Sequence, residues 1–178
     1  MNVDLSIIPE CFVDTNLIET INPPKKGYNH QKGCGNVAKT MQKKLKDSFA
    51  VGIIDRDKKE IKYLDEFQLK INTGNLFLYQ HPDKPHYIIQ ISPAIESFIL
   101  ECTAQINVKT EEYGLPNSLD EFKKITKKQT SKKNTLLSRL FADLKNKKAP
   151  QIVTLSNWIS YLKENTYYSN IDEIRNIQ

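Results

Sequence analysis

Three aspartates near the start of the chain each follow an apolar segment. Asp14 comes directly after residues 11–13, and Asp55 and Asp57 come after the uncharged run 49–54. In an extended segment, residues two apart point to the same side, so Asp55 and Asp57 are expected to face one crevice. Clustered carboxylates repel one another unless a cation lies among them, and such hard oxygen ligands suit Mg²⁺ or Mn²⁺. The pattern predicts a Mg²⁺ (or Mn²⁺) site made of Asp14, Asp55 and Asp57.

Two strands must place these carboxylates together. Residues 49–54 carry no charge and end at charged residues, which is typical of a strand buried on both faces of a parallel sheet. Residues 11–13 are predicted to be a strand that leads into a helix over 15–21. In open α/β sheets, ligands bind outside the carboxyl ends of the strands, so neighbouring strands would bring the aspartates together. The alternative is that Asp14 only caps the helix and that Asp55 or Asp57 only begins a turn.

The rest of the chain separates into an alternating part and a helical part. Apolar spacing predicts a helix at 37–45, a short helix at 63–69, strands at 75–79 and 87–91, and a helix that Ser92 caps with Pro93 in its first turn. Alternating strands and helices indicate an α/β fold, a mostly parallel sheet flanked by helices in a Rossmann-like manner. Beyond residue 114 only helices are predicted, beginning at Ser118 and covering 134–146 and 156–165. We therefore predict an α/β domain over 1–114 and a basic helical extension over 115–178.

Positive charge is concentrated in that extension. The 178-residue chain has a net charge of +5, and residues 118–150 hold ten basic against three acidic side chains. This distribution indicates a polyanionic partner, either DNA or RNA. The alternative is a solvated helix face with a lysine-rich loop. The candidate nucleic-acid contacts are Lys127, Lys128, Lys132, Lys133 and Arg139.

The composition argues against several other classes of protein. No apolar run approaches the ~20 residues that a membrane span needs, and residues 1–8 do not resemble a signal peptide. The three cysteines form no CxxC pair, which argues against a disulfide scaffold or a zinc site. We therefore expect a cytoplasmic protein with no membrane partner.

The order of these motifs resembles the Toprim domain, the metal-binding domain of topoisomerases, primases and OLD-family and related nucleases. The family pattern is a Glu after the first strand, a glycine nearby and a DxD after a later strand. Residues 12–15 stand at the first motif, with Asp14 in place of the Glu and Thr15 in place of the glycine. Residues 52–57 resemble the DxD strand, residues 29–37 the glycine loop, and residues 93–100 a downstream acidic motif. The resemblance covers roughly residues 8–102.

The resemblance implies roles for four acidic residues. Asp55 and Asp57 would ligate Mg²⁺, while Asp14 would share the metal or act as general base in phosphodiester chemistry. Glu96 would complete the acidic set, although it is equally well explained as a carboxylate on a helix face. The implied activity is that of a Mg²⁺-dependent, nuclease-like enzyme of a bacterial defence or mobile-element system, with a possible protein partner such as an ATPase.

The Toprim-like resemblance also implies that the glycine loop binds a phosphate. Lys32 and the backbone amides around Gly33 and Gly35 stand at the expected N-terminus of a helix, where anions bind. A plain surface loop is the alternative.

Two other functions are compatible with the sequence. The chain could be a non-catalytic Toprim-like module that binds nucleic acid or protein. Residues 12–18 also resemble the opening of a PIN-type ribonuclease, a strand followed by Asp-Thr-Asn and a helix.

Overall fold

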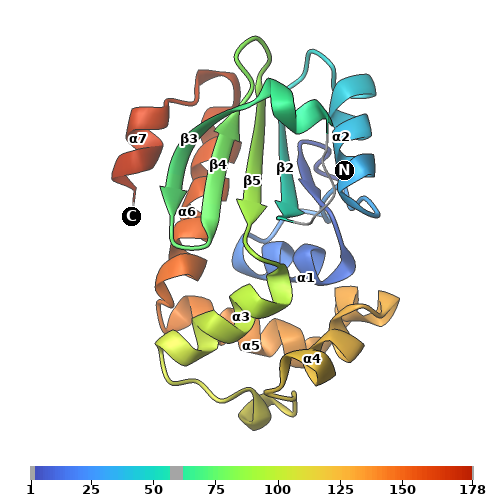
Figure 1. The fold of residues 1–178 in the computed structure, drawn as a ribbon, viewed down its shortest axis with the longest axis vertical. Coiled ribbons are helices and arrows are strands. Elements are labelled where there is room, and N and C mark those ends of the chain that lie inside the picture. Colours follow the sequence, from blue (N-terminus) through green and yellow to red (C-terminus); the bar gives the residue numbers. More distant parts are fainter. Residues whose placement is uncertain (1–2, 57–61, 178) are drawn as a thin grey trace.

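The protein is built around one five-stranded mixed sheet. The computed structural model describes residues 3–56 and 62–177. The strands lie in the order β1-β2-β5-β4-β3 (Figure 1). β1, β2 and β5 are parallel, whereas β4 runs antiparallel to β5 and β3 antiparallel to β4. The predicted α/β class is confirmed, and the sheet is parallel only over β1, β2 and β5. The strand bounds are β1 Ile7–Pro9, β2 Ala50–Asp55, β3 Gln68–Thr73, β4 Leu76–Gln80 and β5 His86–Ile91.

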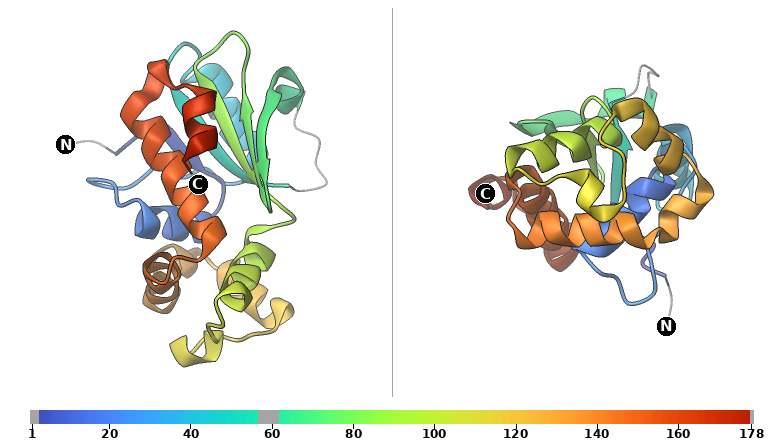
Figure 2. Two further views of the ribbon diagram at one scale, coloured as in Figure 1. Left: turned by 90° about the vertical axis from the view of Figure 1, so that its left-hand side faces the viewer. Right: turned by 90° about the horizontal axis from the view of Figure 1, so that it is seen from below.

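Helices cover both faces of the sheet and one of its ends. Figure 1 shows α1, α3, α4 and α5 gathered at the end toward which the arrows of β2 and β5 point. The left view of Figure 2 shows α6 running along one face of the sheet. The helices are α1 Phe12–Ile21, α2 Cys34–Lys43, α3 Ile95–Gln105, α4 Leu119–Thr126, α5 Thr135–Asn146, α6 Pro150–Asn165 and α7 Ile171–Asn176. The 3-10 turns are η1 Lys62–Glu66, η2 Thr110–Tyr113, η3 Gln129–Lys133 and η4 Thr166–Tyr168.

The strand β2 is buried on both faces, as its uncharged sequence predicts. Val51 and Ile53 belong to the main hydrophobic core, which includes residues of α1, α3, α5 and α6. Ala50 and Ile54 belong to a second, smaller core formed with α2 and η1. Alternate residues of a strand point to opposite faces, so both faces of β2 are apolar and a charge is accommodated only at its end. This places Asp55 at the carboxyl edge of the sheet.

The main core contains residues from both sides of the boundary predicted at residue 114. It joins Ile89 of β5 to Leu140 of α5 and Trp158 of α6, all of which are almost fully buried. Burial of a large apolar side chain contributes about 1.5–3 kcal/mol, so α5 and α6 contribute to the same core as the sheet. Residues 115–178 therefore complete one core rather than form a separate one. No helix in residues 3–56 or 62–177 is both long and apolar enough to cross a membrane.

The first strand lies earlier in the chain than the sequence analysis predicts. Residues 11–13 are not a strand: Cys11 is the N-cap of α1, and Phe12 is its first residue. Cys11 Sγ accepts a hydrogen bond from the backbone amide of Asp14, and Asp14 Oδ2 accepts one from the backbone amide of Cys11. This reciprocal capping box starts the helix. The PIN-type resemblance assumed a strand directly before Asp14, so the structure removes its basis.

Two further local predictions were inexact. The short helix predicted at 63–69 forms as the 3-10 helix η1, Lys62–Glu66, and the chain then enters β3 at Gln68. Helix α3 begins at Ile95 after the N-cap Ala94, so Pro93 is not in its first turn. The amide of Ile95 donates instead to Asp55 Oδ1 at 2.9 Å. A side chain from β2 therefore caps this helix, and no local sequence pattern can show that.

Candidate active site

Glu10 and Asp55 meet at the carboxyl edge of two neighbouring parallel strands. The β1–β2 register pairs Pro9 with Ile53, so Glu10 and Asp55 leave the sheet side by side. The Asp55 amide donates to Glu10 Oε2 at 3.0 Å, and the Glu10 amide donates to the Ile53 carbonyl at 3.0 Å. Sequence reasoning missed Glu10 because it placed the strand four residues too late. The signal that marks it is the apolar pair Ile7-Ile8, which precedes it in the chain.

Glu96 joins this pair from the first turn of α3. It is 8% exposed, and its Oε1 accepts a hydrogen bond of 2.7 Å from the Thr126 hydroxyl. Asp55 caps the same helix at the neighbouring Ile95 amide. The positive end of the helix dipole favours negative charge at both carboxylates. Glu96 and Asp55 therefore both lie at the N-terminus of α3 and line the same cavity.

Asp14 lies within α1 rather than after a strand, yet it belongs to the same cluster. It is 1% exposed, and within the described part of the chain its Oδ1 has no hydrogen-bond partner. Burial raises the pKa of Asp14, and the charges of Glu10 and Glu96 raise it further. Asp14 and Asp55 are thus close enough to interact electrostatically, although Asp14 lies in α1 and not at a strand end.

The electrostatics of Asp55 show how crowded the cluster is. Burial is the main cause that raises the pKa of Asp55, and the charges of Asp14, Glu10 and Glu96 add to it. The amide of Ile95 acts in the opposite direction. A cation among these carboxylates would offset the cost of ionising them.

The donors fit an open magnesium site better than a closed metal cage. Asp57, the second acid of the DxD motif, lies outside the described residues. Among residues 3–56 and 62–177, no three His, Cys, Asp or Glu side chains form a ready ligand set. Mg²⁺ usually keeps several waters and binds through one or two carboxylates together with substrate phosphates. Glu10 and Asp55 could supply two such carboxylates, and the unpartnered Oδ1 of Asp14 lies buried in the same cluster.

A cavity of about 300 Å³ opens over the carboxylates. Glu10, Asp55 and Glu96 line it together with Lys32 and Lys127. It therefore combines acidic groups with two of the predicted basic contacts. Such a combination suits a substrate that carries phosphates next to a cation.

A second cavity, of about 710 Å³, continues this surface along η3. It is lined by Lys132 and Lys133 and shares Phe12 and His30 with the first cavity. Together the two cavities form what we call the groove. Lys128 is exposed but lines neither cavity.

Arg139 lies elsewhere. It is exposed on α5, close enough to Tyr113 of η2 for its charge to oppose the burial that raises the pKa of Tyr113 to about 12. It does not line the groove. The predicted basic surface is therefore divided, with Lys127, Lys132 and Lys133 on the groove and Arg139 apart from it.

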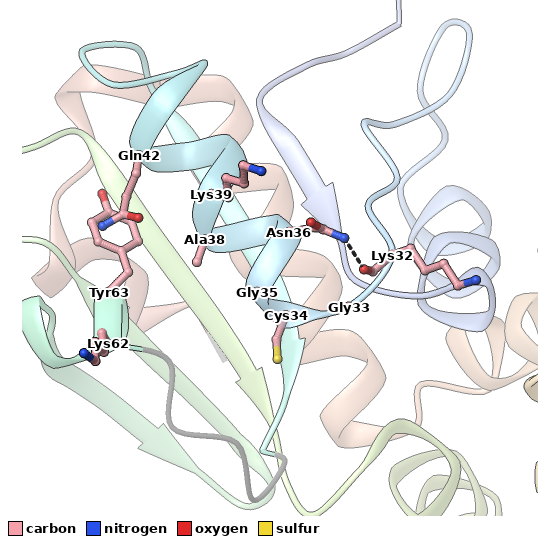
Figure 3. Close-up of a pocket in the computed structure, with 10 residues that line it drawn as sticks. All are labelled: Lys32, Gly33, Cys34, Gly35, Asn36, Ala38, Lys39, Gln42, Lys62 and Tyr63. Carbon is pink, nitrogen blue, oxygen red and sulfur yellow. Dashed lines mark hydrogen bonds between the residues drawn. The ribbon is translucent and has the colours of Figure 1, made fainter.

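The glycine loop reaches the site through Lys32 and Gly33. Gly33 is the N-cap of α2 with a φ of 90°, a conformation that favours glycine. Lys32, Gly33 and Gly35 also line a separate cavity of about 500 Å³ beside α2. Figure 3 shows the Lys32 side chain extending away from α2, while its carbonyl accepts a 2.6 Å hydrogen bond from the Asn36 amide group. The loop thus borders the carboxylate cavity on one side and α2 on the other.

We compared the chain with protein-family models, curated proteins and solved structures. No family model, curated protein or solved structure shows significant similarity to the chain. The site is therefore described by its own geometry: a Glu10 carboxylate bonded to the backbone amide of Asp55 across parallel strands, two further buried acids, and a lysine-bordered groove.

Proposed function

We propose that this chain is a Mg²⁺-dependent enzyme that cleaves phosphodiester bonds in nucleic acid. The observation that supports the proposal is the pairing of Glu10 and Asp55 on the wall of a cavity that Lys32 and Lys127 also line. Carboxylates are the ligands that Mg²⁺ prefers, and lysines are suited to the phosphates of a polyanion. Acidic and basic groups on one cavity wall are what such a reaction requires.

The acidic and basic residues of the site would have different roles in this reaction. Glu10 and Asp55 would hold the cation, and the chemistry that it would supply when bound is polarisation of a phosphoryl oxygen and activation of water. Glu96 and Asp14 keep the surroundings of that pair negative. Lys32 and Lys127 counter the charge of the phosphates on either side of the scissile bond.

The Toprim-like resemblance supports the same proposal. Its pattern needs a Glu directly after the first strand, and Glu10 follows β1 directly. We therefore propose that Glu10, rather than Asp14, takes the position of that Glu. Cys11 then occupies the position next to the Glu where the pattern has glycine. The setting in a bacterial defence or mobile-element system, with an ATPase partner, remains part of the proposal.

Cleavage assays on the full chain test this function. Supercoiled plasmid, single-stranded DNA and RNA are incubated with MgCl₂, MnCl₂ or EDTA. We expect cleavage only with the divalent cation, and its loss in Glu10→Gln and Asp55→Asn. The matched control is Glu112→Gln, because Glu112 is an exposed acid of η2 that does not line the groove.

Two results would contradict the proposal. One is cleavage that persists in EDTA, and the other is cleavage by Asp55→Asn at the wild-type rate. Nucleic-acid binding without cleavage in any cation would favour the alternative, a binding module that does not turn over.

A further inference from the structure

An aromatic pair separates the carboxylate cavity from the cavity along η3. The rings of Phe12 and His30 are stacked, with centroids 4.6 Å apart and an angle of 22° between their planes. Both residues are only partly buried, and both line each of the two cavities. The pair is therefore in reach of a ligand in either cavity.

The pair is held in place by the first turn of α1. The Thr15 hydroxyl donates to the Cys11 carbonyl at 2.7 Å, so its oxygen accepts from His30 Nδ1 at 2.8 Å. This arrangement requires the proton of a neutral imidazole to be on Nδ1. Burial lowers the pKa of His30, and the charge of Lys132 lowers it further. The lowered pKa favours the neutral ring, and the contact with Thr15 restrains its orientation.

Charge on η3 complements the aromatic pair. Lys132 and Lys133 line the same cavity as Phe12 and His30, together with Gln129 and Thr130. Proteins that bind single-stranded nucleic acid combine a positively charged groove with aromatic side chains on which bases stack. In a duplex the bases are already stacked on their neighbours, so their faces are not open to such a platform.

We infer that the Phe12–His30 pair is a base-stacking platform that selects a single-stranded polynucleotide and leads it from η3 to the carboxylates. This inference names the substrate class of the proposed function and rests on it. The phosphates of the strand would follow Lys132 and Lys133, and one base would lie against the aromatic pair. DNA and RNA share this chemistry, and the binding experiment separates them.

Binding measured in EDTA tests the inference without any cleavage step. Fluorescein-labelled twelve-nucleotide single-stranded DNA, its RNA equivalent and a blunt duplex are titrated with the full chain, and anisotropy is recorded. We expect at least one single strand to bind about tenfold more tightly than the duplex. Phe12→Leu is expected to weaken single-strand binding about fivefold or more, since stacking contributes substantially per base. Phe12→Tyr keeps the ring and should retain the affinity.

Tyr168→Leu is the matched control. Tyr168 is 89% exposed in η4 and lines neither cavity of the groove, so its loss should leave binding unchanged. Equal affinity of duplex and single strands, or unchanged binding by Phe12→Leu, would overturn the inference.

A cross-linking experiment on the wild-type protein covers the case in which Phe12→Leu does not fold. A 5-iodouracil strand irradiated in the complex should cross-link to peptides that contain Phe12 or His30. Cross-links confined to other segments would refute the platform. Binding is measured in EDTA and therefore does not depend on the metal-dependent step. If Phe12→Leu weakens single-strand binding but no cleavage occurs in any cation, only the proposed function is contradicted. If cleavage occurs but Phe12→Leu binds as tightly as the wild type, only this inference is contradicted.

Discussion

The backbone amide of Asp55 donates a 3.0 Å hydrogen bond to the side chain of Glu10. The two residues are 45 positions apart in the chain, and the parallel β1–β2 register brings them together. One acidic side chain is thus oriented by the backbone of the other. The Asp55 carboxylate is oriented by helix α3, because its Oδ1 accepts a hydrogen bond from the Ile95 amide. These two hydrogen bonds orient both carboxylates.

A divalent cation should stabilise the folded protein. Burial raises the pKa of Asp55, the charges of Asp14, Glu10 and Glu96 raise it further, and a cation bound beside Asp55 would offset that repulsion. At ten times its Kd, such a ligand adds about 1.4 kcal/mol to the free energy of unfolding. For a chain of this size the Tm should rise by about 3–6 °C. Differential scanning fluorimetry with Mg²⁺ or Mn²⁺ measures the shift.

Asp55→Asn provides the control for that measurement. The variant keeps the side-chain oxygen that accepts from Ile95 but lacks the charge, so the Tm shift should disappear. Glu112→Gln should retain the full shift. The same shift in Asp55→Asn and in the wild type would show that the cation binds elsewhere.

Lysines of the groove should matter more for nucleic-acid binding than Arg139. Lys132 lines the groove, whereas Arg139 lies near Tyr113. Lys132→Gln should weaken binding and reduce the slope of log K against log salt by about one. Arg139→Gln should change neither quantity. Titrations at several salt concentrations measure both, and an equal loss in the two variants would argue against the groove as the binding surface.

Acid should destabilise the protein through His86. Its ring is fully buried, with Nδ1 accepting from the Tyr63 hydroxyl and Nε2 donating to the Leu45 carbonyl. Burial lowers the pKa of His86, and the charges of Lys84 and His81 lower it further. The unfolded chain therefore binds a proton more readily than the folded one, so stability present above about pH 6.5 is lost as the pH falls.

Urea unfolding between pH 7 and pH 5 measures this effect. The raised pKa values of Asp14 and Asp55 act in the opposite direction over this range, so the effect of His86 is measured as the difference between two proteins. Between pH 7 and pH 5, acid should destabilise His86→Gln less than it destabilises the wild type. His30 has a lowered pKa as well, so His30→Gln should remove another part of the dependence. An identical pH dependence in His86→Gln and the wild type would exclude His86 as a cause.

Two glycine-to-alanine changes should have opposite effects on stability. A Cβ at Gly52 would lie 2.8 Å from Ile88 Cδ1 and 2.9 Å from Val37 Cγ1, whereas a Cβ at Gly35 would meet nothing within 4 Å. Gly52→Ala should therefore cost about 1–3 kcal/mol through overpacking between β2 and α2. Gly35→Ala should be neutral or stabilise α2 by up to about 1 kcal/mol. Urea midpoints compare the two, and equal midpoints would contradict the close packing at Gly52.

The sequence was sufficient where local patterns decide structure. The uncharged run before Asp55 identified a strand buried on both faces, and Asn134 marked the start of α5. Periodic leucines marked the buried face of the same helix. These features depend on residues close in the chain, whose spacing matches the period of a strand or a helix. The sequence by itself therefore established the α/β class and the position of Asp55.

Only the tertiary structure identified Glu10. The three-residue strand β1 is too short for its periodicity to be recognised, and it is stabilised by pairing with β2. The same limit applies to Asp55 as the cap of α3, and to Lys132 beside the aromatic pair. Each of these contacts joins residues far apart in the chain. They form because the parallel register and the shared core bring the strand ends, α3 and η3 to one edge of the sheet, which no local pattern encodes.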